Sequence, residues 1–282
     1  MLAAERRAQG AGRRAQIMTH LERDGTVRVS DLVSLLGVSD MTVRRDLEVL
    51  QGHGVLDKVH GGAVVRAEPS SLEPGFEVKS ARQTDQKEAI ALRAAALVAP
   101  GSAIAISAGT TTHALARQLV SVPQLTVVTN SVWVADVLHR SGNTTLTVLL
   151  TGGLRTPSDA LVGPIAISAL RSLHLDAVFM GVHGMDARAG FSTPNLLEAE
   201  TNRAMVSSGR RLLVLADSTK WGVVGLSSMA ALEEASTVIS DVGLSSQARM
   251  ALIEQVDEVI LVDPVTVDAL TVDPAGESSP VG

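Results

Sequence analysis

Apolar residues recur at helical spacing near the start of the chain. Ile17 and Leu21 lie four positions apart among polar neighbours, and this period predicts an amphipathic helix over residues 13–24. A brief β-prone link follows. Ser30 is then expected to cap a second helix over residues 31–36, which a glycine ends. The first segment is therefore predicted to contain short helices in succession.

A third helix is predicted over residues 40–51, with Ser39 as its N-terminal cap. A rotation of about 100° per residue places Val43, Leu47 and Leu50 on one stripe, which is expected to face a core. The side chains that point away from this stripe are Met41, Thr42 and Arg45, with Arg44 at its flank. The third helix thus offers a polar face to a partner.

Three further segments complete the outline of the chain. Residues 55–64 predict a β-hairpin, which gives the first segment the element order of a winged helix-turn-helix. Residues 67–86 contain proline and glycine without a sustained period and are predicted to be a linker. Residues 264–282 are expected to form a disordered tail. The expected domains are therefore residues 1–66 and residues 87–263.

From residue 87 onward, short apolar runs alternate with helical periods. This alternation predicts parallel strands joined by crossover helices, so the expected fold class is an α/β domain with a mainly parallel sheet, preceded by a small winged helix-turn-helix domain. The helices are expected over residues 88–98, 113–119 and 132–140. The strands are expected over residues 103–106, 125–129, 145–150, 177–182, 211–216, 237–240 and 258–262.

The composition excludes several classes of protein. The chain has no Cys, which rules out disulfides, thiolate metal sites and cysteine nucleophiles, and its seven His form no HExxH pair. We predict no cofactor and no metal site, and we assign no catalytic residue. The apolar runs are shorter than the ~18 residues of a membrane span, and we find no export signal, so we expect a cytoplasmic protein without membrane contact. Three Phe and two Trp are too few for a base-stacking surface.

The net charge of −6 conceals an uneven distribution. Residues 1–66 hold ten Lys and Arg against eight Asp and Glu, whereas the rest of the chain holds fourteen against twenty-two. Because an acidic body repels DNA, any contact with DNA is expected to come from the first segment.

The outward face of the third helix has residue types that read DNA. An arginine in the major groove can bond guanine O6 and N7, and small hydroxyls can contact a base or a phosphate. A lysine on the hairpin can reach a neighbouring phosphate. The alternative is an ordinary solvated helical face. The candidate DNA-binding residues are Ser39, Met41, Thr42, Arg44, Arg45 and Lys58.

Residues 13–64, with their ending Leu-Asp-Lys-Val-His-Gly-Gly-Ala, resemble the winged helix-turn-helix of the DeoR family of bacterial transcriptional regulators. The resemblance implies a protein that binds double-stranded operator DNA through the third helix. Asp46 is expected to hold Arg44 or another nearby arginine in place, because a carboxylate that faced phosphates would be repelled.

Polar and glycine-rich segments follow several predicted strands of the second domain. Open α/β sheets bind ligands at the carboxyl ends of their strands, where hydroxyls, backbone N–H groups and basic side chains can hold an anion such as a sugar phosphate. For each segment, an ordinary helix cap or a surface arginine is the alternative. The segments cover residues 107–112, 129–131, 152–155, 181–186 and 217–222.

Residues 87–263 resemble the sensor domain of the same family, which is similar to the ribose-5-phosphate isomerase and sugar-phosphate deaminase fold. The resemblance implies a phosphorylated sugar or related metabolite as small-molecule effector. Ser107 stands where the family usually has Asp, and Asn202 stands where Lys is common, and these departures favour an altered effector. The candidate effector-binding residues are Ser107, Gly109, Thr110, Thr111, Asn130, Gly152, Gly153, Arg155, Asp186, Glu198 and Lys220.

We predict an effector-responsive transcriptional regulator, which the family implies to be a repressor of a carbohydrate operon and a homo-oligomer, either dimer or tetramer. One rival is a DNA-binding protein whose second domain serves for dimerisation alone. The other is an enzyme similar to sugar-phosphate isomerases, with Asp186 or Glu198 as general base. Residues 187–197 contain no lysine, whereas the resembling isomerases carry a Lys-Gly-Gly-Gly run there, and this difference disfavours catalysis.

Overall fold

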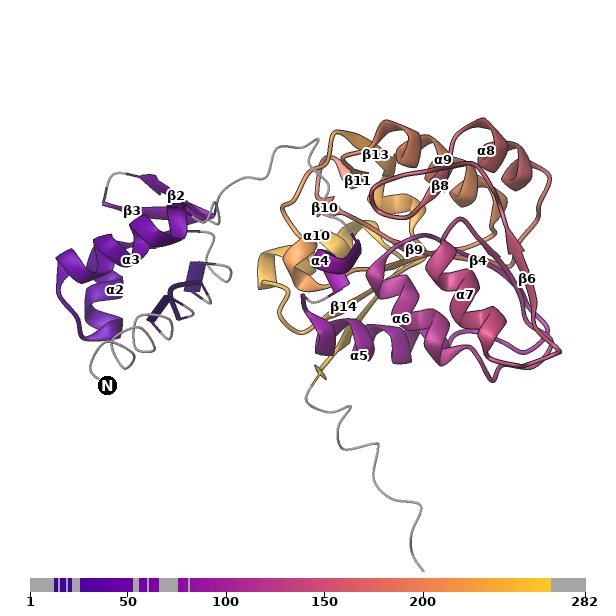
Figure 1. Ribbon diagram of the computed structural model, residues 1–282, viewed down its shortest axis with the longest axis horizontal. Coiled ribbons are helices and arrows are strands. Elements are labelled where there is room, and N and C mark those ends of the chain that lie inside the picture. The colour runs from indigo at the N-terminus through magenta and orange to yellow at the C-terminus, as the bar shows by residue number, and fades with distance from the viewer. Residues whose placement is uncertain are drawn as a thin grey trace, which may run out of the picture. The chain divides into compact units, whose positions relative to one another are not determined.

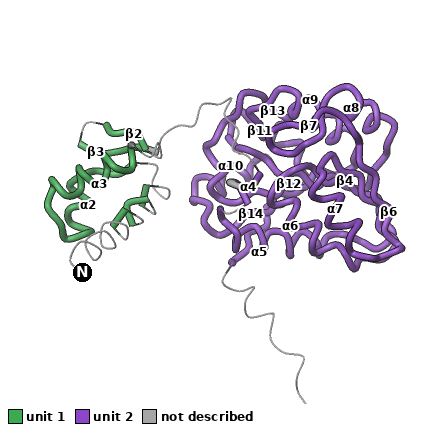
Figure 2. Tube along the Cα trace, in the orientation of Figure 1, with its two compact units in different colours: residues 1–69 green, residues 70–282 purple. Residues whose placement is uncertain are grey.

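The computed structural model describes residues 13–14, 16–18, 20–21, 26–52, 56–59, 61–65, 76–80 and 82–264. The chain divides into two compact units, residues 1–69 and residues 70–282, called here the N-terminal unit and the C-terminal unit (Figure 2). The expected tail over residues 264–282 lies outside the described residues, except for its first residue.

The N-terminal unit packs helices against a three-stranded antiparallel sheet of order β1-β3-β2. Ile17 and Leu21 of the first helix are fully buried, together with Val43 and Leu47 of the third. The stripe predicted from the sequence therefore does face a core. The elements are α2 (Val29–Leu36), α3 (Asp40–Gly52), β1 (Thr26–Arg28), β2 (Leu56–Val59) and β3 (Gly62–Val65).

The start of the second helix differs from the expectation. Helix α2 begins at Val29 with Arg28 as its N-cap, no side chain caps it, and Ser30 instead lies in its first turn and bonds Asp31. The expected link before it is strand β1, which pairs with β3. The helix starts early because Val29 is buried and its N–H donates to Gly61 O at 2.9 Å, directly at the end of the strand. The expected end at Gly37 is confirmed, with φ of 63°.

The C-terminal unit is built on a seven-stranded parallel sheet of order β15-β14-β12-β9-β4-β5-β6. All seven strands fall where the sequence places them, which confirms the α/β fold class. They are β4 (Ala103–Ile106), β5 (Thr126–Thr129), β6 (Thr147–Leu150), β9 (Ala177–Gly181), β12 (Leu212–Leu215), β14 (Thr237–Asp241) and β15 (Glu258–Val262).

Helices cover both faces of this sheet, as Figure 1 shows. In β12, Leu213 and Leu215 face one layer, whereas Leu212 and Val214 face the other. This double burial explains why the central strands are uninterrupted apolar runs. The first layer contains α5 (Thr84–Ala95), α6 (Thr110–Gln118) and α7 (Val132–Arg140), and the second contains α8 (Pro164–Arg171), α9 (Leu196–Ser208) and α10 (Ser246–Gln255).

Several short elements were not expected from the sequence. A second sheet, β10-β11-β13, joins the layer of α9, and β7 pairs with β8. The expected linker also contains helix α4 (Phe76–Ser80), and α5 begins within it. The short strands are β7 (Leu154–Arg155), β8 (Leu161–Val162), β10 (Gly184–Asp186), β11 (Gly190–Thr193) and β13 (Ser227–Ala230), with short 3-10 helices at Ser218–Lys220 and Leu232–Glu234.

The substitution Gly62→Ala should destabilise the N-terminal unit by at least about 2 kcal/mol. Strands β1 and β3 approach so closely that a Cβ at residue 62 would lie 2.1 Å from the carbonyl oxygen of Val27. Hydrogen exchange of the β1 and β3 amides would measure the loss. Both tryptophans, Trp133 and Trp221, lie in the C-terminal unit. The unfolding transition that tryptophan fluorescence reports should therefore be the same as in the unsubstituted protein. Unchanged exchange in β1 and β3 would contradict the packing described.

Candidate functional site

Helix α3 begins with two hydroxyl side chains bonded to each other. Ser39 caps the helix as expected, because its Oγ accepts the N–H of Thr42 at 3.3 Å. The two hydroxyl oxygens lie 2.9 Å apart. Both side chains are at least partly exposed, so the start of α3 presents a hydroxyl pair to solvent.

The outward face of α3 carries an apolar side chain and two arginines. Met41 is 80% exposed. Arg44 is paired with Asp40, with Nε 2.5 Å from Oδ1, and this bond lowers the pKa of the Asp40 carboxyl. Arg45 is exposed, and among the described residues no side-chain partner is found for it. Arg45 is therefore the arginine of this face that can bind a ligand without first breaking an ion pair.

Asp46 lies on the opposite side of α3 and is 4% exposed. Its carboxylate accepts Nε of Arg13 at 2.8 Å and Nη1 of Arg14 at 3.2 Å. The expectation that Asp46 holds an arginine in place is confirmed, although its partners belong to the first helix and Arg44 is not among them. The two charged bonds fix the first helix against α3.

Lys58 of β2 is paired with Glu48 of α3, with 2.9 Å between Nζ and Oε1. Glu48 is exposed, and exposed pairs of this kind contribute little, ~0–1 kcal/mol. Lys58 can therefore exchange this carboxylate for another anion at small cost.

Polar residues at the carboxyl ends of β4, β5 and β9 are tied together by hydrogen bonds. Asn130 is buried, its Oδ1 accepts the N–H of Ala108 at 2.8 Å, and its Nδ2 donates to Leu161 O at 3.3 Å. Ser107 is also buried, and its Oγ accepts the N–H of Gly181 at 3.0 Å. These two predicted effector residues hold the loops in position with their own side chains.

The loop after β4 leads directly into helix α6. Gly109 is the N-cap of α6 and no side chain caps the helix. Thr110 and Thr111 form its first turn, whose N–H groups are oriented away from the helix. An uncapped helix start beside hydroxyl side chains is suited to an anion. The glycines after β6 serve the backbone instead, since Gly152 and Gly153 have positive φ and a Cβ at residue 153 would lie 2.5 Å from Val162 O.

Glu198, on α9, forms a separate buried cluster with hydroxyl side chains. Its carboxylate accepts hydrogen bonds from Thr156 at 2.7 Å, from Ser158, and from Thr193 at 3.3 Å. The arrangement ties α9 to the segment between β7 and β8.

Asp186 and Arg155 are engaged locally. Asp186 Oδ1 accepts the N–H groups of Arg188 and Ala189, each at 2.9 Å, and these bonds lower the pKa of the Asp186 carboxyl. Arg155 donates from Nε to Asp159 at 2.7 Å. Asp159 also accepts Nε1 of Trp133 at 2.8 Å, which joins Arg155 to the first turn of α7, whereas the bonds of Asp186 stay within its own turn.

Three lysines and a histidine lie within electrostatic reach of one another near the ends of β9 and β12. Burial, opposed by Asp217 and assisted by repulsion from Lys220 and Lys79, lowers the pKa of Lys87 to about 8. Burial is also the main cause that lowers the pKa of His183 to about 4, and repulsion from Lys220 and Lys79 adds to it. These four residues, Lys79, Lys87, His183 and Lys220, are called here the basic cluster, in which His183 is uncharged near neutral pH. The sequence indicated Lys220 as a site residue and His183 as part of the segment 181–186. Lys79 and Lys87 were missed because they lie within or beside the expected linker.

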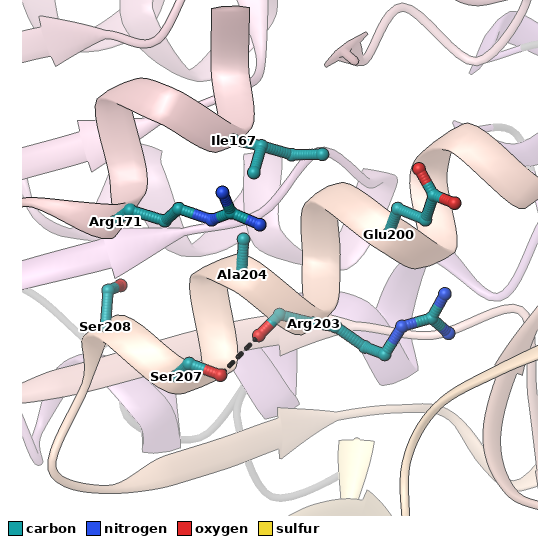
Figure 3. A pocket seen from close by; sticks show the side chains of 7 residues that line it. All are labelled: Ile167, Arg171, Glu200, Arg203, Ala204, Ser207 and Ser208. Atoms are coloured by element: carbon teal, nitrogen blue, oxygen red, sulfur yellow. Dashed lines mark hydrogen bonds between the residues drawn. The ribbon is translucent and has the colours of Figure 1, made fainter. Parts of the chain in front are cut away.

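A hollow of about 530 Å³ lies elsewhere, between α8 and α9 (Figure 3). None of the predicted site residues lines it. Its walls are formed by Ile167, Arg171, Glu200, Arg203, Ala204, Ser207 and Ser208.

Across the described residues, no group of three or more His, Asp or Glu side chains is placed to hold a metal ion. In the same part of the chain, no helix combines the length and the apolar character needed to cross a membrane.

Comparison with known proteins gives matches over both units. A family model described as the DeoR-like helix-turn-helix domain matches residues 13–68, and the DeoR C-terminal sensor domain matches residues 82–242. The chain is 35% identical over 261 residues to a protein assigned as an aga operon transcriptional repressor in Escherichia coli O157:H7, covering 92% of this chain and 96% of the relative.

A second relative is the lactose phosphotransferase system repressor of Streptococcus mutans, which is 34% identical over 227 residues, covering 80% of this chain and 90% of the relative. Among solved structures, ribose 5-phosphate isomerase A of Methanocaldococcus jannaschii aligns with 49% of this chain and 54% of its own, at 14% identity and a TM-score of 0.37.

The lowered pKa of Lys87 predicts a pH-dependent stability of the C-terminal unit. Its pKa is about 8 in the folded protein, against 10.5 ordinarily. Between these values the unfolded state binds more protons, so raising the pH should stabilise the fold. The chain has no Tyr or Cys to titrate in this window. Lys87→Met should abolish this gain, measured by urea unfolding with tryptophan fluorescence.

The matched control is Lys58→Met, which removes a lysine from the N-terminal unit and should leave the pH profile of the C-terminal unit intact. Below about pH 7, the difference in stability between the Lys87→Met and unsubstituted proteins should be constant. A difference that stays constant from pH 7 to pH 10.5 would show that Lys87 is not perturbed by burial.

Proposed function

The chain belongs to the DeoR family of transcriptional regulators, and from this premise we propose that it is a sequence-specific repressor of a carbohydrate operon. It binds double-stranded operator DNA through the N-terminal unit. A phosphorylated sugar or related metabolite, bound by the C-terminal unit, releases it from the operator. The observation that carries this proposal is the gathering of cationic side chains at the carboxyl ends of the parallel strands.

The outward face of α3 supports a DNA-reading role. Arg45 is exposed and has no side-chain partner among the described residues, so it can enter a groove and bond a guanine at no electrostatic cost within the protein. Arg44 would have to break its ion pair with Asp40 before it could bond a base. The hydroxyl pair of Ser39 and Thr42, and Lys58, supply phosphate contacts that position the helix. Met41 adds an apolar contact.

The C-terminal unit supports recognition of an anion. Lys220 and Lys79 lie close enough to Lys87 to lower its pKa, whereas the carboxylate of Asp217 raises it. The uncapped start of α6 adds N–H groups at Thr110 and Thr111. We assign the phosphate of the effector to these groups. The loops around the phosphate are held in position by Ser107, Gly109, Asn130, Gly152 and Gly153. The remaining candidates for contact with the effector are Arg155, Asp186 and Glu198.

Both carboxylates that were considered as general bases have structural hydrogen bonds. Glu198 accepts three side-chain hydrogen bonds and Asp186 accepts two from the backbone. We therefore propose a binding role for this unit, in keeping with relatives that are transcriptional regulators. We also propose that the protein acts as a homo-oligomer, whose copies bind repeated half-sites.

Arg45→Ala should weaken binding to operator DNA by about 1 to 3 kcal/mol and relax the preference at one or two base pairs. The operator is obtained by selecting bound duplexes from a random pool with the full chain, and affinities are measured at fixed salt. The control is Arg171→Ala, which removes an arginine from the C-terminal unit. Unchanged affinity for Arg45→Ala would remove Arg45 from the interface, and a selection without any preferred sequence would overturn the proposed function.

Lys58→Ala provides a contrast within the same experiment. A phosphate contact carries no base information, so this variant should lose affinity for all sequences alike. The slope of log affinity against log salt should also fall by about one.

Lys220→Gln should abolish the response to effector while leaving the operator complex intact, because the ammonium interacts with the effector and not with DNA. A thermal-shift screen against sugar phosphates, sugar acids and nucleosides identifies the effector, and release of the selected operator measures the response. Arg171→Gln is the matched control. No hit in the screen would favour a C-terminal unit that serves for oligomerisation alone, and product formation from any compound would favour an enzyme.

A further inference from the structure

Helix α4 packs its first residue on two rings of the C-terminal unit. Phe76 stacks on Trp133 with ring centroids 5.3 Å apart, and it meets the ring of His113 edge-on at 5.5 Å. His113 and Trp133 lie in the first turns of α6 and α7, which follow the loops after β4 and β5. Helix α4 is therefore anchored against α6, beside the candidate effector site (Figure 1).

The ring of Trp133 is held in turn by the carboxylate of Asp159. Trp133 donates from Nε1 to Oδ2 of Asp159 at 2.8 Å, and Oδ1 accepts Nε and Nη2 of Arg155, each at 2.7 Å. Asp159 has φ of 64°, in the left-handed region that few residues other than glycine adopt, so the contacts around it hold it there. One carboxylate thus joins the ring under Phe76 to an arginine.

Arg155 lies on a hairpin that is bonded to the loop after β5. It stands directly opposite Leu161 in the pair of β7 and β8. The N–H of Leu161 donates to Asn130 O at 2.7 Å, and its carbonyl oxygen accepts Nδ2 of Asn130 at 3.3 Å. Oδ1 of Asn130 accepts the N–H of Ala108, one residue before Gly109, the N-cap of α6. Arg155 therefore belongs to the same bonded group of loops as the proposed phosphate site.

The ion pair between Arg155 and Asp159 can be exchanged for a ligand. The side chain of Arg155 is 59% exposed, and exposed ion pairs contribute little to stability. Nε and Nη2 are a pair of donors with which an arginine holds a phosphate or a carboxylate in bidentate fashion. A ligand anion and the carboxylate of Asp159 repel each other, so both cannot occupy these donors. An anion that binds there must therefore displace Asp159.

We propose that Asp159 is a positioning residue that transmits effector binding to α4. The anionic group of the effector takes Arg155 from Asp159, and the released carboxylate no longer fixes Trp133, which weakens the stacking of Phe76. This inference rests on the proposed function. Ten residues, 66–75, join β3 to α4, and release of α4 lengthens this connection. In a homo-oligomer, a longer connection lowers the effective concentration of the second DNA-binding unit at its half-site, so affinity for the operator falls.

The emission of Trp133 tests the first step. In the full chain with Trp221→Phe, Trp133 is the single tryptophan. Millimolar inorganic phosphate at constant ionic strength should shift its emission to longer wavelength and increase its quenching by acrylamide several-fold, because the ring loses its contact with Phe76. Calorimetry measures binding of phosphate separately. Binding without any change in the emission of Trp133 would overturn the inference and leave the proposed function standing, whereas absence of binding would count against both.

Asp159→Asn distinguishes a positioning role from a merely structural one. Asparagine still offers an oxygen to Trp133 and tolerates the left-handed backbone, but it has no charge with which to compete for Arg155. Phosphate should therefore bind about two- to fivefold more tightly, while the emission of Trp133 no longer responds. The matched control is Asp136→Asn, which breaks an exposed pair of α7 with Arg140 at 2.8 Å and should change neither quantity. Weaker phosphate binding, or an unchanged emission response, in Asp159→Asn would overturn the inference.

Phe76→Ala tests the second step, the connection to DNA. Helix α4 should then be released without effector, so that affinity for the selected operator falls in the absence of phosphate and phosphate has no further effect on it. Hydrogen exchange over residues 76–80 should be several-fold faster than in the unsubstituted protein, and unchanged exchange in β9 shows that the C-terminal unit is folded. A full response of operator binding to phosphate in this variant would overturn the inference.

Discussion

The seven strands of the C-terminal unit run in one direction, and this constraint determines where its chemistry lies. Every carboxyl end meets the same edge of the sheet, so loops far apart in sequence must share one small region and satisfy their backbone groups there. Ser107 and Asn130 do this with buried side chains that accept the N–H groups of neighbouring loops. The loops at this edge are therefore held in place by side chains of the protein itself.

The same edge brings basic side chains together although the chain as a whole is acidic. Lys87 is buried with its ammonium on two carbonyl oxygens, and Asp217, Lys220 and Lys79 lie within its electrostatic reach. Burial lowers the pKa of Lys87 to about 8 and that of His183 to about 4, so the histidine is uncharged near neutral pH. The hydrogen bonds of Lys87 tie α4 and the residues before α5 to this edge.

The N-terminal unit separates its charges by role. Asp46 is buried under Arg13 and Arg14 and fixes the helices against each other, whereas Arg45 on the outward face is left without a side-chain partner in the described part of the chain. Placing the acid inside and the base outside gives a basic surface to a segment whose net charge is small. Local arrangement, more than total charge, determines which polyanion such a unit can approach.

The amino-acid sequence by itself determined the seven strands of the parallel sheet and the buried face of α3, because their periods of burial are local: the stripe through Val43 and Leu47, and the apolar run of β12, indicate their faces without reference to the fold. Tertiary structure alone decided which polar groups are already engaged. Nothing in the spacing shows that three hydroxyls donate to Glu198, or that Lys87 donates back to a carbonyl oxygen of α4, because these contacts depend on how helices and loops fold onto one another and leave no periodic signal along the chain.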